Sequence, residues 1–292
     1  MSRQEQYDWL RLMWTRGLSF DLAKTLLSAI GLPEMIFSES YSALCQVVPE
    51  SVARRLCMRI DPEIHERIET ALLWVERNPE ADLIVMTDSR YPRRLLSIPE
   101  PPLAFFTWGD TTYLTIPGVS LVGSTHPNQE GVDLARQWAH KLSESCAVLV
   151  EGMSEGIERV ALQGMWKQAQ AKAILVLDRP MALCDESVVR AMADRHLVVS
   201  LVGPYDEIDE PQRWEFRNRL LLGLCSSFVL VQASIRSRSL SFLREALDLN
   251  RNVMAIPGSI HSPLSKGSHR LIKDGARLVE TIEEVLDEMR VS

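Results

Sequence analysis

The sequence contains no long uncharged hydrophobic run. No stretch of about 18 apolar residues, the length that a helix needs to cross a bilayer, occurs in the chain. The first 17 residues, MSRQEQYDWLRLMWTRG, carry charges throughout and lack the apolar stretch and cleavage site of a secretory signal peptide. The sequence therefore predicts a cytoplasmic protein with no membrane partner.

The sequence also offers little that suits a metal site or covalent catalysis. Its five cysteines form no CxxC pair, and its six histidines form no HxxxH or HExxH pattern. We interpret the cysteines as small apolar residues of the core. No GxSxG elbow, Walker loop or kinase signature is present. The sequence thus predicts no catalytic residue, no metal and no cofactor, although a triad assembled from distant residues would leave no such motif.

Charge is distributed unevenly along the chain. The net charge is −7, which at first argues against a nucleic-acid partner. Residues 211–277, however, carry 11 Lys or Arg and 4 Asp or Glu, while the remainder carries 21 basic and 35 acidic residues. A basic segment in an acidic protein would confine any contact with a polyanion to one region. The same pattern also fits a solvated face that is neutralised from within, so both interpretations stay open.

The pattern of apolar residues divides the chain into three parts. Residues 5–78 show helical spacing interrupted by glycine and proline, so we assign residues 1–80 to a small all-α domain. Residues 81–117 contain a short strand and a proline-rich connecting segment. In residues 118–292, short apolar runs alternate with helical segments. This part predicts an α/β fold with a doubly wound parallel sheet.

The predicted elements of the third part alternate regularly. Apolar runs typical of buried strands occupy residues 118–123, 147–152, 173–178, 197–203, 227–233 and 253–258. Helical segments lie near residues 129–144, 155–170, 185–194, 217–225 and 238–250. Because doubly wound sheets bind ligands at the carboxyl ends of their strands, we expect a site in the loops that follow these runs.

Two of these loops contain glycine at a strand-to-helix step. Gly123 and Ser124 end the first run, and Gly152 and Gly156 lead from the second run into a helix. Backbone amides and a helix N-terminus in such a step can hold a phosphate. Three acidic residues in or beside the second loop would repel a phosphate there: Glu151, Glu155 and Glu158.

Two later regions are richer in cations and hydroxyl groups. Arg217 and Arg219 flank Asn218 just before an apolar helix. Their guanidinium groups can grip phosphate oxygens or pair with acids of the same fold. Further on, a loop that is poor in acids collects the donors Gly258, Ser259, Ser265, Lys266, Gly267, His269 and Arg270. Glycine amides, hydroxyls and cations in one loop predict a cradle for phosphate or sugar.

These residues resemble the DprA (Smf) family of DNA-processing proteins over nearly the whole chain. The resemblance rests on DSRYPRRLLSIPEPPLAFFTWGD (88–110), RNRLLLGL (217–224) and PGSIHSPLSKGSHRLIKDGA (257–276). It implies a Rossmann-like domain preceded by a small SAM-like helical domain. It also implies a non-enzymatic protein that binds and protects single-stranded DNA, loads a RecA-type recombinase during natural transformation, and usually works as a homodimer.

The chain departs from the family pattern at several positions. Thr125 stands where the family's V-G-S-R loop has an arginine, and acidic residues enter its S-G-x-A-R-G-I-D loop at 151–158. Arg238 replaces a glycine of the family's S-G-S-L, and no C-terminal winged helix like that of many relatives follows Met289. The sequence is thus identified as a divergent member of the family.

We hypothesise that the DNA path has shifted toward Arg217, Arg219, Arg236, Arg238 and Lys266. Ser237 and Ser239, which flank Arg238, are further candidates for phosphate contact. One alternative is an adaptor in a larger protein complex that has lost DNA binding. Another is an enzyme acting on a nucleotide, like the related lysine-decarboxylase-like phosphoribohydrolases. The P-G-G-x-G-T-x-x-E loop of those enzymes is missing here.

Overall fold

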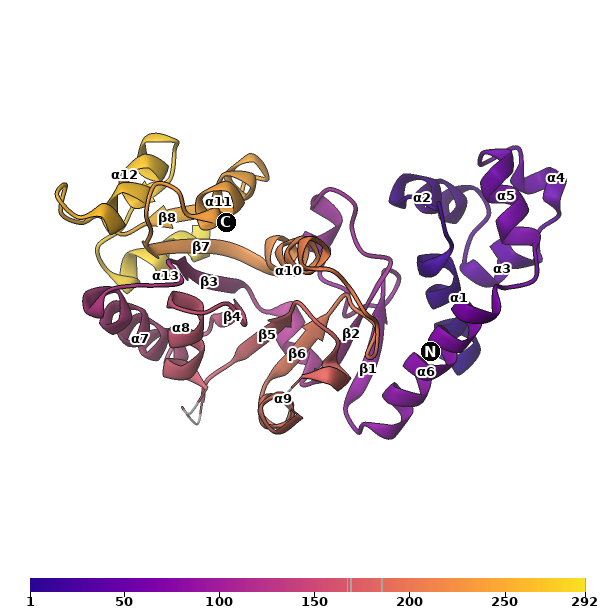
Figure 1. Ribbon diagram of the computed structural model, residues 1–292, viewed down its shortest axis with the longest axis horizontal. Coiled ribbons are helices and arrows are strands. Elements are labelled where there is room, and N and C mark those ends of the chain that lie inside the picture. Colours follow the sequence, from indigo (N-terminus) through magenta and orange to yellow (C-terminus); the bar gives the residue numbers. More distant parts are fainter. Residues whose placement is uncertain (167, 169, 185, 292) are drawn as a thin grey trace.

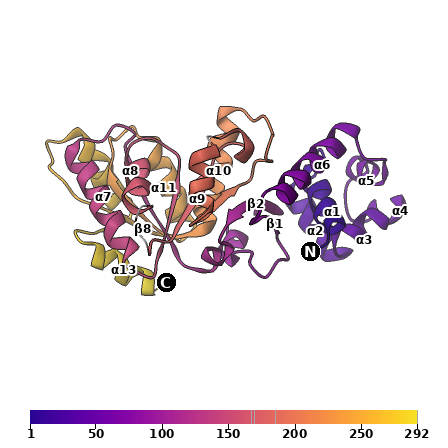
Figure 2. The same cartoon turned by 90° about the horizontal axis from the view of Figure 1, so that it is seen from below.

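The computed structural model describes residues 1–166, 168, 170–184 and 186–291. Its N-terminal part consists of helices α1 to α6, which occupy Arg3–Trp14, Phe20–Ala29, Pro33–Ser38, Tyr41–Leu44, Glu50–Cys57 and Pro62–Arg77. These helices gather at one end of the molecule (Figures 1 and 2). The predicted all-α region at the N-terminus is therefore confirmed.

Local signals start the first helix, and apolar packing docks this helical part on the sheet. Ser2 forms a capping box at the start of α1, because its hydroxyl accepts from the Glu5 amide at 3.2 Å and its own amide donates to the Glu5 carboxylate at 2.6 Å. At the other side of the domain, the indole of Trp74 in α6 packs edge-on against that of Trp108 in the sheet, with ring centroids 5.6 Å apart. The helical core is thus continuous with one face of the sheet.

Within the described residues, nine strands form one sheet in the order β1-β2-β6-β5-β4-β3-β7-β8-β9. Strands β1 to β9 occupy Ala81–Val85, Ala104–Gly109, Gly118–Gly123, Val148–Gly152, Ala173–Leu177, Leu197–Ser200, Cys225–Gln232, Asn252–Ala255 and Arg277–Leu278. The β1–β2 and β2–β6 pairs are antiparallel, and the other pairs are parallel.

Helices cover both faces of this sheet. Helices α7 to α13 occupy Gln129–Ser143, Ile157–Met165, Glu186–Ala193, Glu210–Leu224, Arg238–Asp248, Lys266–Lys273 and Ile282–Val291. The 3-10 helices η1 to η4 occupy Arg93–Ser97, Thr111–Thr115, Met181–Leu183 and Pro263–Ser265. Figure 1 shows α10, α11 and α12 on one side of the sheet and α7, α8 and α9 on the other. Alternate strand residues belong to two apolar clusters, so Leu149 packs with α8 while Val148 and Val150 pack with α10. The doubly wound α/β fold is confirmed.

The predicted strands of residues 118–258 are present, and each begins within two residues of its predicted start. Helix α10 begins at Glu210, well before the predicted start at residue 217. Asp209 caps it by accepting from the Gln212 amide at 2.9 Å. The sequence missed this start because the first two turns of α10 are polar and show no apolar periodicity. The predicted helices 155–170 and 185–194 also include residues 167, 169 and 185, which lie outside the described residues.

Residues 81–117 contribute β1 and β2 to the sheet. The second of these strands was not predicted, because it follows four closely spaced prolines that read as a connecting stretch. The division of the chain at residues 80 and 117 stays a prediction.

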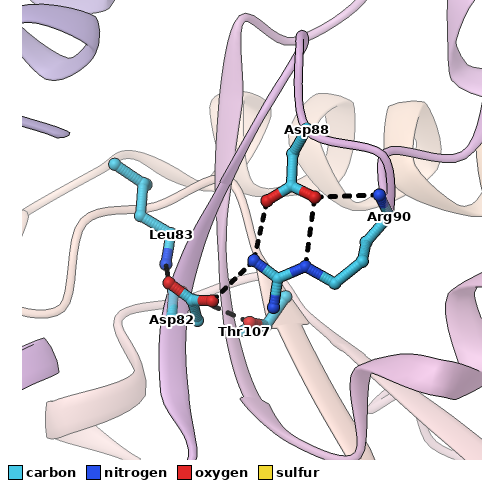
Figure 3. Close-up of polar contacts among 5 residues, drawn as sticks. All are labelled: Asp82, Leu83, Asp88, Arg90 and Thr107. Carbon is cyan, nitrogen blue, oxygen red and sulfur yellow. Dashed lines mark hydrogen bonds and ion pairs between the residues drawn. The ribbon is translucent and has the colours of Figure 1, made fainter. Parts of the chain in front are cut away.

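Asp88 stabilises a turn in the segment between β1 and β2 (Figure 3). The Asp88 carboxylate accepts from the Arg90 amide at 2.8 Å and from its guanidinium at 3.1 and 2.7 Å. The same guanidinium lies 2.8 Å from the Asp82 carboxylate. The hydrogen bonds from Arg90 lower the pKa of Asp88. Next in the chain, the buried Tyr91 hydroxyl donates to the Pro102 carbonyl at 2.8 Å. The D-x-x-Y-P signature, residues 88–92, therefore shapes the turn between β1 and η1.

This turn sets η1 against helix α10 at Gly223. A Cβ built on Gly223 would lie 2.1 Å from Leu95 Cδ2, and Leu95 is fully buried. Arg251 fixes the same crossing, because it donates to the Leu222 carbonyl at 2.9 Å and to the Arg94 carbonyl at 3.1 Å. Close packing thus requires glycine at position 223.

We expect Gly223→Ala to destabilise the protein by about 1–3 kcal/mol, the usual cost of overpacking a buried contact. Alanine would otherwise stabilise a helix interior by about 1 kcal/mol relative to glycine. In a Leu95→Ala background the clash is absent, so Gly223→Ala should be neutral or stabilising there. Urea unfolding of the four proteins measures both effects, and an equal cost in the two backgrounds would contradict this contact.

Candidate nucleic-acid interface

The order of the strands reverses at β3. From β3 the chain moves outward through β4, β5 and β6, and then returns to place β7 on the other side of β3. In doubly wound sheets, such a switch point leaves a crevice at the carboxyl ends of the strands. Helices α7, α8, α11 and α12 follow parallel strands and begin at this edge. The partial positive charges of their N-termini therefore lie along this edge of the sheet.

Gly123 and Ser124 lie against the end of β7. The Ser124 amide donates to the Gln232 carbonyl at 2.7 Å, and the Ser239 hydroxyl donates to the Gly123 carbonyl at 3.0 Å. A Cβ on Gly123 would lie 2.8 Å from the same Gln232 carbonyl. The structure thus brings Gly123, Ser124 and Ser239 together, and the buried Ser239 hydroxyl is used to join β3 to α11.

Gly156 brings the second glycine loop onto the first. It precedes α8 with a φ of 80°, and a Cβ there would lie 2.1 Å from the Ser124 carbonyl oxygen. The amide of Ile157 donates to that carbonyl at 3.1 Å. Position 156 therefore requires glycine for its positive φ and for a close backbone approach. One of the amides that a phosphate would need is already occupied.

Arg217 lies in the middle of α10 and not just before an apolar helix, which corrects its predicted placement. Arg217 is 3% exposed, and its guanidinium forms an ion pair with the equally buried Glu158 of α8. It also donates to the Asn218 side-chain oxygen at 2.8 Å. A Cβ on Gly152 would lie 2.1 Å from Arg217 Nε, so glycine makes room for the guanidinium. Because α8 and α10 cover opposite faces, this ion pair joins the two layers around the end of β4.

Glu151 lies between the diverging ends of β3 and β4. These strands pair at two positions, the second of which is Val119 with Leu149. Beyond that point the fully buried Glu151 carboxylate accepts from the Leu121 amide at 2.6 Å and from the Ser120 hydroxyl at 3.0 Å. The carboxylate thus replaces the missing ladder between the two strands.

We call Glu151, Glu158 and Arg217 the buried cluster. Burial raises the pKa of Glu151 well above the usual range of a glutamate, and the neighbouring charge of Glu158 raises it further. The hydrogen bonds from Leu121 and Ser120 and the charge of Arg217 act in the opposite direction. Burial and the neighbouring Glu158 charge therefore favour the protonated form of Glu151.

Arg219 also meets acids of the same chain. Its guanidinium contacts Glu215 one turn earlier in α10 and lies 3.1 Å from Glu100. Its side chain is 20% exposed. Of the two interpretations of the Arg217–Arg219 pair, the structure shows internal pairing for both arginines.

Three exposed cations lie on the other side of the switch point, and we call them the basic ridge: Arg236, Arg238 and Lys266. The loop after β7 and the start of α12 are adjacent, because the Gly267 amide donates to the Ala233 carbonyl at 2.9 Å. Arg238 lies 3.8 Å from Glu210. Among the residues that the structure describes, Arg236 and Lys266 have no ion-pair partner. They are therefore available to a polyanion.

The serine-rich loop between β8 and α12 folds back beside this ridge. Nε2 of His269 lies 3.0 Å from the Gly258 carbonyl, and a Cβ on Gly258 would lie 2.3 Å from the Ser265 hydroxyl oxygen. Gly258 and Ser259 are exposed, whereas Ser265 is buried. The loop thus has a fixed shape and leaves part of its donors open to solvent.

The remaining predicted residues serve helix ends and packing. The Ser237 hydroxyl caps α11 by accepting from the Ser239 amide at 3.3 Å. A Cβ on Gly267 would lie 2.6 Å from the Ala233 carbonyl. Arg270 points along α12 to Asp274, one turn later, at 3.0 Å. These contacts fix the positions of α11 and α12, whose first residues carry Arg238 and Lys266.

Sequence reasoning missed Trp214. This half-buried indole lies in the second turn of α10, with the Arg217 guanidinium carbon 5.2 Å from its ring centroid. A correct prediction of the start of α10 at residue 210 would have placed Trp214 near the carboxyl ends of the strands. An aromatic face there can stack with a base.

None of the helices in the described part of the chain is long and apolar enough to span a bilayer. The same residues include no group of three or more His, Cys, Asp or Glu side chains placed to hold a metal ion.

Comparison with known proteins gives the family. The profile of the family described as DNA recombination-mediator protein A matches residues 82–290. The chain belongs to this family. It is 33% identical to the DNA processing protein DprA of Streptococcus pneumoniae over 207 residues, which are 69% of this chain and 72% of that protein. The resemblance inferred from the sequence is therefore confirmed.

Solved structures agree with this assignment. The X-ray structure of DprA from Streptococcus pneumoniae matches with a TM-score of 0.78 and 25% identity, covering 99% of this chain and 98% of that one. DprA from Helicobacter pylori, whose structure is described for its single-stranded DNA binding mode, shares the fold with a TM-score of 0.60 and 20% identity. That match covers 72% of this chain and 95% of the other.

We expect Glu151→Gln to reduce the pH dependence of stability. A carboxyl whose pKa is raised in the folded state stabilises the fold while protonated, so the wild type loses this contribution as the pH rises from about 4.3 toward the raised value. Glutamine resembles the protonated carboxyl at every pH. Between about pH 5 and pH 8, the variant's free energy of unfolding, measured in urea, should therefore change less than that of the wild type.

Glu158→Gln provides the contrast for this experiment. It breaks the ion pair of the buried Arg217 with Glu158, which we expect to cost about 3–5 kcal/mol. Identical pH profiles for the wild type and Glu151→Gln would show that Glu151 does not hold the proton.

Proposed function

We propose that this chain binds single-stranded DNA through its phosphates and delivers it to a RecA-type recombinase in the cytoplasm, without catalysing a reaction. Its membership of a family of DNA recombination mediators supports this role, as does the DNA binding described for the Helicobacter pylori relative. The observation that carries the proposal is the basic ridge, a set of exposed cations at the switch point of a doubly wound sheet.

The proposed DNA path follows the ridge. Arg236 and Lys266 break no internal ion pair when they bind phosphate, since neither has such a partner in the described part of the chain. The N-termini of α11 and α12 and the exposed Gly258 and Ser259 offer backbone and hydroxyl donors beside them. Cations flanked by neutral donors suit a backbone that must be held without regard to sequence.

We assign Arg217, Asn218 and Arg219 a supporting role in this site. To reach a phosphate, Arg217 would have to leave Glu158 and uncover a buried carboxylate, at a cost of several kcal/mol. Direct contact of these three residues with DNA stays a prediction. Their pairing with internal acids favours the view that they hold the strand ends in place.

We further propose that the chain acts as a homodimer or within a larger protein complex. Recombination mediators bring DNA and recombinase together, so a RecA-type protein is the expected partner. Sedimentation velocity tests the oligomeric state. Pull-down of purified recombinase with and without single-stranded DNA tests the partnership.

An adaptor without DNA binding is the second candidate function. Ile235 and Ile260 are 53% and 66% exposed on the loops that form the ridge, and exposed apolar side chains beside charged ones occur in protein contact surfaces. This candidate predicts that oligonucleotides do not bind and that a stable protein partner does.

We expect Arg236→Ala/Lys266→Ala to lower the affinity for a fluorescein-labelled single-stranded oligonucleotide about tenfold or more at low salt. Each phosphate contact on a single strand contributes about 0.7 to the slope of log K against log salt, so losing two contacts should reduce that slope by about 1.4. Fluorescence anisotropy between about 50 and 200 mM salt measures both quantities.

The matched control is Lys24→Ala/Arg59→Ala, which removes two exposed cations from the helical part. It should change the affinity by less than about twofold, because screening limits the reach of distant charges. Binding that ignores salt and the ridge variant alike would refute the proposal. Complete absence of binding, with a partner retained in pull-down, would favour the adaptor.

A further inference from the structure

A short acidic segment shares the edge of the sheet with the basic ridge. We define it as residues 206–210, which hold Asp206, Glu207, Asp209 and Glu210. The segment follows β6, which is parallel to its neighbour β5, so it leaves the sheet at the edge where the proposed DNA path lies. A DNA strand on that edge would meet carboxylates as well as cations.

One contact places the segment against the ridge. The Glu210 carboxylate lies 3.8 Å from the Arg238 guanidinium, and both side chains are largely exposed. Such a pair adds little to stability, but it puts a negative charge where a phosphate would bind Arg238. Asp209 fixes the position of Glu210, because it caps α10 by accepting from the Gln212 amide.

The other end of the segment is anchored to the helical part. Arg67 of α6 donates from Nε to one Asp206 oxygen at 2.8 Å and from Nη2 to the other. Its guanidinium also stacks on the Trp14 ring, 3.9 Å from the centroid. Asp206 accepts a third hydrogen bond from the Gly203 amide at 2.9 Å. A two-point guanidinium–carboxylate contact has a defined geometry, so the helical part holds the segment in place.

We infer that the acidic segment competes with the DNA backbone for the basic ridge, and that Arg67 holds the segment in the competing position. The inference rests on the proposed DNA binding and adds its regulation. A strand that reaches Arg238 must displace Glu210, and the exposed Glu207 adds a second negative charge to the same segment. The helical part thereby influences DNA binding without touching DNA.

We expect Glu207→Gln/Glu210→Gln to bind the labelled oligonucleotide about three- to tenfold more tightly than the wild type at about 50 mM salt. The gain should shrink toward about 200 mM, because exposed charges are screened. Both side chains are exposed and neither caps a helix, so the fold is retained. Fluorescence anisotropy gives the dissociation constants.

The matched control is Glu34→Gln/Glu39→Gln. It makes the same change of net charge at two exposed positions in and beside α3, and α3 and α11 lie in opposite halves of the molecule (Figures 1 and 2). We expect less than about a twofold effect. A gain for Glu207→Gln/Glu210→Gln that is no larger than that of this control would overturn the inference.

The same titrations separate this inference from the proposed function. If the wild type binds and responds to Arg236→Ala/Lys266→Ala, but removing the acidic charges changes nothing, the inference alone is wrong. If neither the wild type nor Glu207→Gln/Glu210→Gln binds DNA, both are wrong. Binding by the acidic-segment variant alone would support a segment that blocks the site completely.

A second variant tests the anchor. Arg67→Met keeps an apolar contact with Trp14 but loses both hydrogen bonds to Asp206. Because the substitution removes a positive charge, net charge predicts weaker DNA binding, whereas release of the acidic segment predicts binding about two- to fivefold tighter. Unchanged or weaker binding by this variant, with a normal circular dichroism spectrum, would overturn the role of Arg67.

Discussion

The ion pair between Arg217 and Glu158 is the contact on which the site depends. Arg217 comes from α10 on one face of the sheet, and Glu158 comes from α8 on the other. They meet at the end of β4 because Gly152 has no side chain to block the guanidinium. Next to them, Glu151 fills the gap where β3 and β4 diverge. The strand ends at the switch point are thus held by charges that cannot leave without uncovering a buried partner.

This arrangement decides which charges remain for a ligand. Glu158, which stands where the family's S-G-x-A-R-G-I-D loop also has an acid, neutralises Arg217 from within, and Glu155, which stands at the arginine of that loop, pairs with Arg159. The glycine-loop half of the edge therefore has no free guanidinium in the described residues. The basic ridge lies beyond β7, on the first residues of α11 and α12 and the loop before α11. Part of the excess positive charge of residues 211–277 therefore reaches solvent at the basic ridge, while Arg217 and Arg219 in α10 serve the fold. Internal neutralisation thus accounts for the arginines of α10, and exposed charge that could contact a polyanion accounts for the basic ridge.

Strands and pairings differ in how far the sequence reveals them. The buried strands could be predicted because each is apolar on both faces. Gly123 and Gly152 mark real strand ends, and Gly156 marks the start of α8. The start of α10 was missed because its first turns show no apolar periodicity, although the Asp209 cap and Pro211 in the first turn mark a helix start. The Arg217–Glu158 pair joins residues 59 positions apart on helices of opposite faces, and no spacing in the sequence encodes that meeting. The sequence also does not reveal which arginine side chains are exposed. Arg217 is buried and Arg236 is exposed, although both precede or begin predicted apolar helical segments.

The residues of the family motifs mostly fix the positions of helices, turns and loops around the sheet. Asp88 makes the turn before η1, Gly223 admits Leu95, and Gly156 admits the Ser124 carbonyl. Each works through close packing or a fixed hydrogen bond, so a substitution there changes stability before it changes binding. Exposed cations and carboxylates at the same edge carry no such constraint and can vary while the fold persists. The residues that define the family and the residues proposed to bind DNA are thus largely different, and we propose that the balance between the basic ridge and the acidic segment sets the DNA affinity of this edge.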